Sequence, residues 1–368
     1  MDIKNLAILG CTGSIGRQTL SVVDAHPELF RVVALTANSD ERGLNELSEK
    51  YAPGFSALSE RDGEDANILA ATLDEADTVV IAISGMKAIY PLRAALKAGK
   101  RVALANKESI VCGGELLKDE LDAYRERLFP VDSEHSALFQ CMQGLSDQSE
   151  VSRVILTASG GPFREFTKDQ LAGVTVEMAL RHPSWNMGRK ITIDCATLAN
   201  KGLEVMEAHF LFGLPADRID VLIHPGSVVH SFVETVDGAL LAQLGVPDMR
   251  LPIQYALTYP KRLKSPVKTL TARELAALSF SLPDTDRFPA LKLAYDALKA
   301  GGTATAVFNA ANETAVAAFL DRRTGFMDIP TAIEGALGAV PATKPTAFEE
   351  IFDADRKARA YVSNFFAR

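Results

Sequence analysis

The fold is decided near the start of the chain, by the sequence Asn5-Leu6-Ala7-Ile8-Leu9-Gly10-Cys11-Thr12-Gly13-Ser14-Ile15-Gly16. Its apolar first part predicts a short buried strand, and a helical pattern extends from Ile15 to about Ala25. The glycines between them let the backbone turn tightly and approach a pyrophosphate, while the helix N-terminus offers free N–H groups and a partial positive charge. A glycine triplet alone is weak evidence, but its place between a strand and a helix predicts a dinucleotide-binding site.

The residues that follow repeat this alternation of strand and helix. Apolar runs at 31–37, 78–83 and 102–105 predict strands, and residues 90–98 have a helical pattern that ends at Gly99. Apolar strands that alternate with helices indicate a parallel sheet with right-handed crossovers. The predicted fold class is therefore α/β, with a Rossmann-like N-terminal domain.

Length, composition and charge limit the classes of protein to consider. The chain has 368 residues, which suggests two or three domains, and 47% of them are hydrophobic, as expected for a globular protein with a large core. The net charge of −8 argues against a nucleic-acid-binding surface. No apolar stretch is long enough to span a membrane, and the N-terminus lacks the pattern of a secretory signal. The four cysteines form no closely spaced pair, which favours reduced thiols and a cytoplasmic protein.

The middle and the end of the chain predict further regions. Strand-like patterns alternate with loops rich in glycine, proline, serine and histidine at 151–157, 190–196, 221–223 and 239–244. A proline-rich segment follows, and then helical patterns at 290–300, 303–322, 330–338 and 346–366. We therefore expect a dinucleotide-binding domain (1–131), an α+β catalytic domain with a metal site and a flap (132–258), a linker (259–288) and a small helical C-terminal domain (289–368).

Four charged residues are candidates for chemistry. Asp132 and Glu134 follow a strand-like segment, and on an extended backbone their side chains would share a face. With Glu204 they make three carboxylates without a cysteine or histidine partner, a set that suits a hard divalent cation such as Mg²⁺ or Mn²⁺. For Asp132 and Glu134 alone, the alternative is an acidic turn exposed to solvent. Lys107 follows the strand at 102–105, at the edge where parallel sheets bind ligands, but an ordinary surface lysine is the alternative.

The loop at 182–188 contains the only tryptophan of the chain, Trp185, among proline, asparagine and glycine. Such an aromatic residue suits a lid that excludes water from a site. The alternative is a tryptophan that packs the loop onto the body of the protein, because tryptophan is usually well buried.

Taken together and in order, these pieces closely resemble the 1-deoxy-D-xylulose 5-phosphate reductoisomerase family over nearly the whole chain. The matching strings are Gly-Cys-Thr-Gly-Ser-Ile-Gly (10–16), Leu-Ala-Asn-Lys-Glu-Ser (104–109), Pro-Val-Asp-Ser-Glu-His (130–135), Ser-Gly-Gly-Pro-Phe-Arg (159–164), Arg-His-Pro-Ser-Trp-Asn-Met-Gly-Arg-Lys (181–190), Asn-Lys-Gly-Leu-Glu (200–204), His-Pro-Gly-Ser-Val-Val-His-Ser (224–231) and Asn-Ala-Ala-Asn-Glu (309–313). Each string is modest evidence, but the ordered set is specific.

The resemblance implies a role for each matching residue. NADPH would be held by Thr12, Gly13, Ser14, Ile15, Asn106, Glu108 and Gly188. The divalent metal, Mg²⁺ or Mn²⁺, would be bound by Asp132, Glu134 and Glu204, which together with Lys107 form the catalytic set. The phosphosugar substrate would be contacted by Lys107, Ser133, Glu134, Ser159, His182, Trp185, Asn200, Lys201 and Glu204, with Ser159, His182, Asn200 and Lys201 around its phosphate. Residues 182–189 would be the flap, and the protein would be a homodimer.

The same resemblance implies the reaction. 1-Deoxy-D-xylulose 5-phosphate would rearrange and be reduced to 2-C-methyl-D-erythritol 4-phosphate, in the methylerythritol phosphate route to isoprenoids. The metal would serve as Lewis acid and template, and the nicotinamide would supply a hydride, so no protein nucleophile is required.

The chain departs from the family pattern at three places. Cys195 stands where the family has a phosphate-binding serine, and a thiol is a weaker donor than a hydroxyl. Asp40, after the second strand, opposes a 2′-phosphate, and it is equally placed to bind an NAD ribose or to cap a helix, so the choice between NADPH and NADH stays open. The segment between Asp40 and the strand near residue 79 is short for the family, so part of the cofactor domain should be abbreviated.

Other classes of protein also carry a glycine loop. A semialdehyde dehydrogenase needs a cysteine nucleophile with a nearby base, and no cysteine here has an evident partner. A short-chain dehydrogenase needs Tyr-x-x-x-Lys, and the only match, Tyr295 to Lys299, lies in the helical C-terminal part. A homoserine dehydrogenase, or a catalytically silent dinucleotide-binding sensor, would keep the loop without the three carboxylates.

Overall fold

The structure is a computed structural model that describes residues 3–63, 65–181 and 187–367. The chain forms two compact units, each assembled from separate stretches of sequence. Unit 1 consists of Met1–Ser109, Asp119–Phe139 and Asp248–Thr269, and unit 2 of Ile110–Lys118, Gln140–Pro247 and Leu270–Arg368. These units are defined by packing, whereas the four predicted segments describe functional parts along the chain. The division into four segments therefore remains a proposal.

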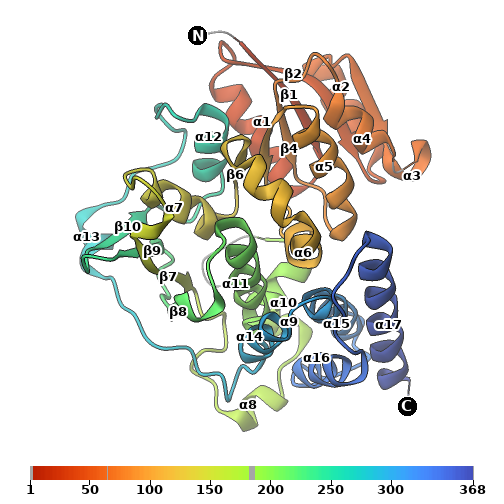
Figure 1. The fold of residues 1–368 in the computed structure, drawn as a ribbon, viewed down its shortest axis with the longest axis vertical. Coiled ribbons are helices and arrows are strands. Elements are labelled where there is room, and N and C mark those ends of the chain that lie inside the picture. Colours follow the sequence, from red (N-terminus) through yellow and green to blue (C-terminus); the bar gives the residue numbers. More distant parts are fainter. Residues whose placement is uncertain (1–2, 64, 182–186, 368) are drawn as a thin grey trace. The chain divides into compact units, whose positions relative to one another are not determined.

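Unit 1 contains a parallel six-stranded sheet in the order β3-β2-β1-β4-β5-β6 (Figure 1). Its strands are β1 (Lys4–Leu9), β2 (Phe30–Ala37), β3 (Phe55–Leu58), β4 (Thr78–Ile81), β5 (Arg101–Leu104) and β6 (Leu128–Pro130). Its helices include α1 (Ser14–Ala25), α2 (Glu41–Tyr51), α3 (Ser59–Asp62), α4 (Asp65–Thr72), α5 (Ile89–Lys97) and α12 (Arg250–Thr258), while α6 (Glu108–Ala123) and α7 (Ser133–Met142) continue into unit 2. The prediction of a Rossmann-like parallel sheet is confirmed.

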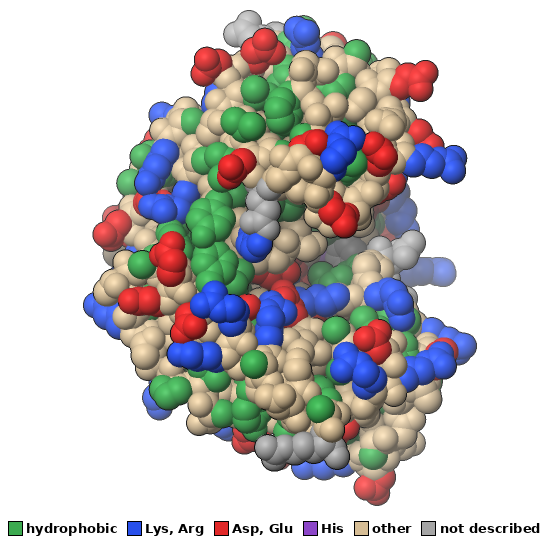
Figure 2. Space-filling view, turned by 90° about the vertical axis from the view of Figure 1, so that its right-hand side faces the viewer, with side chains coloured by type: hydrophobic (Ala, Val, Ile, Leu, Met, Phe, Trp, Pro, Cys, Tyr) green, Lys and Arg blue, Asp and Glu red, His purple; other side chains and the backbone are tan. Residues whose placement is uncertain are grey.

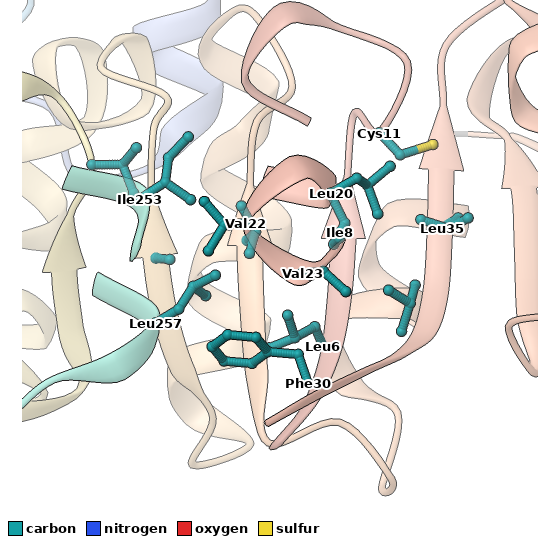
Figure 3. Close-up of a cluster of buried hydrophobic side chains, with 14 of the residues drawn as sticks. Leu6, Ile8, Cys11, Leu20, Val22, Val23, Phe30, Leu35, Ile253 and Leu257 are labelled. Carbon is teal, nitrogen blue, oxygen red and sulfur yellow. The ribbon is translucent and has the colours of Figure 1, made fainter. Parts of the chain in front are cut away.

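The core of unit 1 follows from the alternation of side chains along β1. Leu6 and Ile8 lie in a buried cluster with residues of α1, α2 and α12 (Figure 3). Ala7 and Leu9, which point to the opposite face, are also fully buried, and α4 and α5 contact the strands there. Because helices cover both faces, the strands are continuously apolar, as expected for a parallel sheet.

Two glycines of the loop after β1 are required by close packing. Gly10 has a φ of +84°, and a Cβ there would lie 2.5 Å from the carbonyl oxygen of Ala82. A Cβ on Gly16 would lie 2.6 Å from the Cα atom of Cys11, so the first turn of α1 can approach the end of β1 only because residue 16 has no side chain. The loop is therefore held in one position by contacts within unit 1.

Unit 2 contains a mixed four-stranded sheet in the order β10-β9-β7-β8. β7 and β8 are parallel, whereas the pairs β7–β9 and β9–β10 are antiparallel. The strands are β7 (Val151–Ala158), β8 (Ile219–Ile223), β9 (Val229–Thr235) and β10 (Leu240–Leu244). The helices are α8 (Lys168–Ala172), α9 (Val176–Ala179), α10 (Arg189–Thr197), α11 (Ala199–Phe212), α13 (Ala272–Ala276), α14 (Ala290–Ala300), α15 (Ala304–Leu320), α16 (Asp328–Ala339) and α17 (Phe348–Phe366). The predicted helical C-terminal region is confirmed.

The predicted strand at 190–196 is wrong, because these residues form helix α10. The β-branched residues of Ile191-Thr192-Ile193 favour a strand locally. In the structure, Ile193 and Ala196 are fully buried, and α10 packs against α11 and α15. An ion pair between Lys190 and Asp194, one helical turn apart, further stabilises the helix. Tertiary packing thus outweighs the local preference.

The described surface mixes charges of both signs. Figure 2 shows one face on which basic and acidic side chains lie interspersed with apolar ones, in keeping with 39 basic and 47 acidic residues in the chain. Within the described ranges, every helix is too short or too polar to cross a lipid bilayer.

We expect Gly16→Ala to destabilise unit 1 by about 1–3 kcal/mol, because the added methyl group must displace backbone atoms at the end of β1. Urea unfolding followed by circular dichroism measures the change. Gly338→Ala is the matched control, because this glycine lies in a helix with open space around its Cα. That control should keep or raise stability by up to about 1 kcal/mol. Equal stability of Gly16→Ala and the wild type would mean that the close approach is not needed.

Candidate active site

The candidate active site in unit 1 lies at the carboxyl edge of the parallel sheet. The strand order reverses between β1 and β4, since β1 leads to β2 on one side while β4 and β5 extend the sheet on the other. In open α/β sheets, ligands bind in the crevice outside the carboxyl ends at such a point. Four segments follow strands at this edge. Three contain predicted site residues: the glycine loop after β1, Asn106–Lys107 after β5 and Asp132 after β6. The fourth, Ile83–Gly85 after β4, was not predicted.

The glycine loop presents its backbone at the N-terminus of α1. Gly13 precedes the helix and has no side chain to cap it, so the first N–H groups of α1 receive no side-chain acceptor. Gly13 and Ser14 are exposed, whereas Thr12 and Ile15 are half-buried. All four predicted cofactor residues of this loop therefore lie at a helix N-terminus suited to a pyrophosphate.

Asp40 caps helix α2. Its carboxylate accepts a hydrogen bond from the backbone N–H of Gly43 at 2.9 Å and lies 3.7 Å from the guanidinium of Arg17. Arg17 also donates to the carbonyl oxygen of Thr12, at 2.9 Å, within the glycine loop. Of the two roles left open by the sequence, the structure shows the helix cap, and it places a cation next to that acid.

Asn106 joins three segments at the edge of the sheet. Its side-chain nitrogen donates to the carbonyl oxygens of Ile83 and Gly85, at 3.0 and 3.1 Å, and to Glu108 at 2.8 Å. Its side-chain oxygen accepts from the N–H of Ser109 at 2.9 Å. Asn106 and Glu108 thus hold the loop after β4 against the start of α6, a structural role that the sequence did not reveal.

Lys107 and Asp132 form a shielded ion pair. The Lys107 Nζ lies 2.6 Å from the Asp132 Oδ2, with side-chain exposures of 11% and 13%. The buried His135 lies on the same side, with its Nδ1 3.9 Å from that oxygen. Lys107 is therefore not an ordinary surface lysine, and the exposed acidic turn proposed as the alternative for Asp132 is wrong. Sequence reasoning missed His135, although its position three residues after Asp132 was a signal.

The expected geometry of Asp132 and Glu134 needs correction, because the backbone is not extended there. Helix α7 begins at Ser133, so Asp132 precedes the helix and Glu134 lies in its first turn. The hydroxyl of Ser133 donates to the Glu134 Oε2 at 2.5 Å. The buried strand β6 ends at Pro130. From Ser133 onward, the hydrogen bonds of helix α7 determine the backbone conformation.

In unit 2, Glu204 is a carboxylate that is almost completely buried. It is 1% exposed, and its two oxygens accept hydrogen bonds from the side chains of Lys201 and Asn200. All three residues lie on α11, where positions three and four apart share a face. Burying a carboxylate costs free energy unless an opposite charge and hydrogen bonds compensate for the lost water. Here Lys201 supplies the charge, and both Lys201 and Asn200 donate hydrogen bonds from the preceding helical turn.

The loop after β7 packs directly onto α10. Gly160 and Gly161 both have positive φ angles, of +78° and +66°, and a Cβ on Gly161 would lie 2.9 Å from the carbonyl oxygen of Cys195. The Ser159 Oγ accepts a hydrogen bond from the N–H of Gly161 at 3.3 Å. The structure thus brings the predicted phosphate ligand Ser159 and the half-buried Cys195 to adjoining segments of unit 2.

Helix α10 is anchored behind this loop. Asp194 is 1% exposed, pairs with Lys190 at 3.0 Å and accepts a hydrogen bond from Asn312 at 2.8 Å. The Asn312 amide therefore fixes α10 against α15, a contact that the sequence did not reveal. Gly188 precedes α10 and is exposed, with open space around its Cα. The predicted flap residues His182 and Trp185 lie outside the described residues.

Two alternatives based on other catalytic groups find no support in the geometry. Cys11 faces the core, and burial raises the pKa of its thiol to about 12, so it is a poor nucleophile. The hydroxyl of Tyr295 donates to the carbonyl oxygen of Ile219 at 2.7 Å, and burial raises its pKa. Tyr295 therefore serves packing within unit 2 rather than a Tyr-x-x-x-Lys catalytic pair.

The parallel sheet of unit 1, with a glycine loop at its carboxyl edge, is typical of dinucleotide-binding oxidoreductases. Family models narrow this class. The model for 1-deoxy-D-xylulose 5-phosphate reductoisomerase matches residues 6–65 and 57–114, and its C-terminal domain model matches residues 128–212. The DXP reductoisomerase C-terminal domain model matches residues 244–361.

Similar proteins agree over the full length. The chain is 49% identical to a 1-deoxy-D-xylulose 5-phosphate reductoisomerase from Chlorobium chlorochromatii, over 99% of this chain and 100% of that one. It is 50% identical to one from Geobacter metallireducens, with 97% of each covered. A structure of the Zymomonas mobilis enzyme with NADPH has a TM-score of 0.91 at 41% identity, with 99% of each chain covered. A DOX-P reductoisomerase with NADPH, fosmidomycin and magnesium gives 0.93 at 38% identity, over 99% and 98%. The chain belongs to the 1-deoxy-D-xylulose 5-phosphate reductoisomerase family.

Proposed function

We propose that this chain converts 1-deoxy-D-xylulose 5-phosphate to 2-C-methyl-D-erythritol 4-phosphate, using NADPH and a divalent metal ion. The observation that carries this proposal is the full-length similarity to 1-deoxy-D-xylulose 5-phosphate reductoisomerases. The glycine loop, the buried Glu204 and the half-buried Asp132 and Glu134 support it. The catalytic set is Lys107, Asp132, Glu134 and Glu204.

NADPH would bind at the carboxyl edge of the unit 1 sheet, with its pyrophosphate on the uncapped N-terminus of α1. Thr12, Gly13, Ser14 and Ile15 surround that position, and Asn106 and Glu108 support the neighbouring loop. Gly188, in unit 2, would complete the set. Arg17 offsets the charge of Asp40, so a 2′-phosphate beside the glycine loop meets a cation as well as an acid.

A divalent cation would be bound by Asp132, Glu134 and Glu204. Carboxylate oxygens are the ligands that Mg²⁺ and Mn²⁺ prefer. When bound, such an ion acts as a Lewis acid and orients the substrate oxygens. Lys107 forms an ion pair with Asp132, and Lys201 forms one with Glu204. In the proposed site, both ammonium groups would donate hydrogen bonds to substrate oxygens.

The substrate phosphate would be held in unit 2 by four residues, Ser159, His182, Asn200 and Lys201. The positive-φ glycines after Ser159 turn the loop so that it packs on α10, which fixes the serine in place. Ser133 and Trp185 would contact the rest of the substrate, and residues 182–189 would cover it. Binding energy from the phosphate, remote from the reacting carbons, is then available to orient them.

The alternative function is a catalytically silent dinucleotide-binding sensor. We propose instead that the protein is an enzyme and that it is cytoplasmic. All four cysteines of the chain lie among the described residues and none forms a disulfide there, which suits a reducing compartment. No observation favours a nucleic-acid or membrane partner.

We expect the purified chain to oxidise NADPH when 1-deoxy-D-xylulose 5-phosphate and Mg²⁺ or Mn²⁺ are present, measured at 340 nm with NADH in parallel. EDTA should abolish turnover. Glu204→Gln should lower kcat/KM by about a hundredfold or more, because it removes a metal ligand, while NADPH binding persists. Glu234→Gln, which changes a more exposed acid paired with Arg153, is the control and should keep activity. Absence of nicotinamide oxidation with either cofactor and either metal would support the sensor instead.

We expect Cys195→Ser to lower the KM for substrate about two- to tenfold with little change in kcat, because a hydroxyl donates a stronger hydrogen bond to phosphate than a thiol does. Steady-state kinetics measure the change. Dephosphorylated 1-deoxy-D-xylulose is the control substrate, and its kcat/KM should be unaffected. A similar improvement for both substrates would show that residue 195 does not act on the phosphate.

A homodimer is proposed because β10 is an apolar edge strand. It pairs only with β9 in the sheet of unit 2, and Leu240, Leu241 and Leu244 on it are exposed. Val236 and Leu282 of the same unit are more than two-thirds exposed. An exposed apolar edge favours association with another chain, and a second copy offers the same surface.

Sedimentation velocity should therefore give about twice the 39.6 kDa mass of the chain. Leu241→Lys should shift the protein toward monomer, because the charge would be buried in the interface. Leu69→Lys, at an exposed leucine of unit 1, is the control and should remain dimeric. A dimer that tolerates Leu241→Lys must use another surface.

A further inference from the structure

A cavity lies in unit 1 at the amino edge of the parallel sheet. It has a volume of about 500 Å³, within the range of small-molecule sites. β1 begins there at Lys4 and ends at the glycine loop, so the cavity and the proposed cofactor position lie at opposite ends of this strand. The lining residues come from the starts of β1, β2 and β5, from the turn before β4, and from the end of α12 with the segment after it.

The charged groups around this cavity are mostly positive. Lys4, Arg101 and Lys261 line it, against the single carboxylate of Asp77. The Lys4 Nζ donates to the carbonyl oxygen of Leu257 at 2.7 Å, and the Asp77 carboxylate accepts from the N–H of Asn5 at 2.8 Å. Burial and repulsion from Arg101 lower the pKa of Lys4. A chain of net charge −8 thus concentrates cations at this edge.

The guanidinium of Arg101 forms part of the cavity wall. Its guanidinium stacks on the ring of Phe129, 4.1 Å from the ring centroid, and one terminal nitrogen donates to the carbonyl oxygen of Tyr259 at 3.3 Å. Its Nε is buried and has no hydrogen-bond partner among the described residues. Because this Nε has almost no accessible surface, an anion in the cavity would pair with the terminal nitrogens of the guanidinium instead.

The rest of the wall is apolar. Phe30 and Leu257, which approach each other in Figure 3, form its inner part, and Leu29, Leu263 and Ile3 lie toward solvent. A ligand that filled this space would bury an apolar group against these side chains and place its polar end beside the cations. Apolar area removed from water contributes about 25 cal/mol per Å².

We propose that this cavity binds a small organic anion, a phosphate or carboxylate joined to an apolar group of about the size of one ring. Arg101 and Lys261 pair with the anionic head, and Phe30, Leu257 and Leu263 cover the apolar part. The site is separate from the proposed substrate and cofactor positions.

Calorimetric titration of the full chain with phenyl phosphate tests this proposal. Phenyl phosphate should bind at low ionic strength and more weakly as salt is raised, because the charged contacts are screened. Inorganic phosphate, which lacks the ring, and benzyl alcohol, which lacks the charge, should each bind more weakly. Equal binding of all three probes would contradict the assignment.

Two variants locate the binding. Lys261→Gln changes an exposed side chain and should weaken phenyl phosphate binding about fivefold. Arg101→Met should weaken it at least about tenfold. Lys264→Gln, an exposed lysine of the same segment that does not line the cavity, is the matched control and should bind like the wild type.

Three results would overturn the proposal. Unchanged affinity in Lys261→Gln would place phenyl phosphate elsewhere, for instance at the proposed substrate phosphate site, and this variant remains informative if Arg101→Met fails to fold. A wild type that does not bind phenyl phosphate would also refute the site. Binding to phosphatidylglycerol vesicles without binding phenyl phosphate would assign the cations to a lipid surface instead.

Discussion

All six strands of the unit 1 sheet run in the same direction, and this single constraint determines where chemistry can occur. Parallel strands put their carboxyl ends at one edge, so loops far apart in sequence must meet there. Lys107 and Asp132 are separated by helix α6 and strand β6, yet their charged groups lie 2.6 Å apart. The glycine loop belongs to the same edge, so this one sheet positions both the proposed dinucleotide site and Asp132 of the proposed metal site.

The sequence predicted most of this sheet because buried parallel strands carry an unbroken apolar signal, but it did not predict the short edge strand β3 (Phe55–Leu58). β1 and β4 were visible in the sequence alone, as was the turn at Gly10–Gly16. The prediction was wrong for α10, where Ile191-Thr192-Ile193 resembles a strand locally and only contacts with distant helices decide otherwise. It also placed Glu134 on an extended segment, although Asp132 directly before α7 and Glu134 in its first turn are typical of a helix N-terminus.

Other parts of the site could not be read from sequence because they depend on distant partners. Asn312 lies on α15, and its bond to Asp194 joins residues more than a hundred positions apart. Asn106 was predicted as a cofactor contact, but its amide is occupied by loop carbonyls that only the fold brings near it. The contacts of Glu204, by contrast, depend on a single helix. Its partners Asn200 and Lys201 precede it by four and three residues on α11, so all three side chains share one face.

The separate stretches of unit 1 have a consequence for the order in which the protein can be completed during synthesis. Ile253, Ala256 and Leu257 of α12 complete the apolar cluster around Leu6 and Ile8, but they leave the ribosome more than a hundred residues after β6. At about 5–20 residues per second, the nascent sheet waits several seconds or longer with part of one face uncovered. During that interval the earlier part of the chain is a natural client for a chaperone that shields apolar surface.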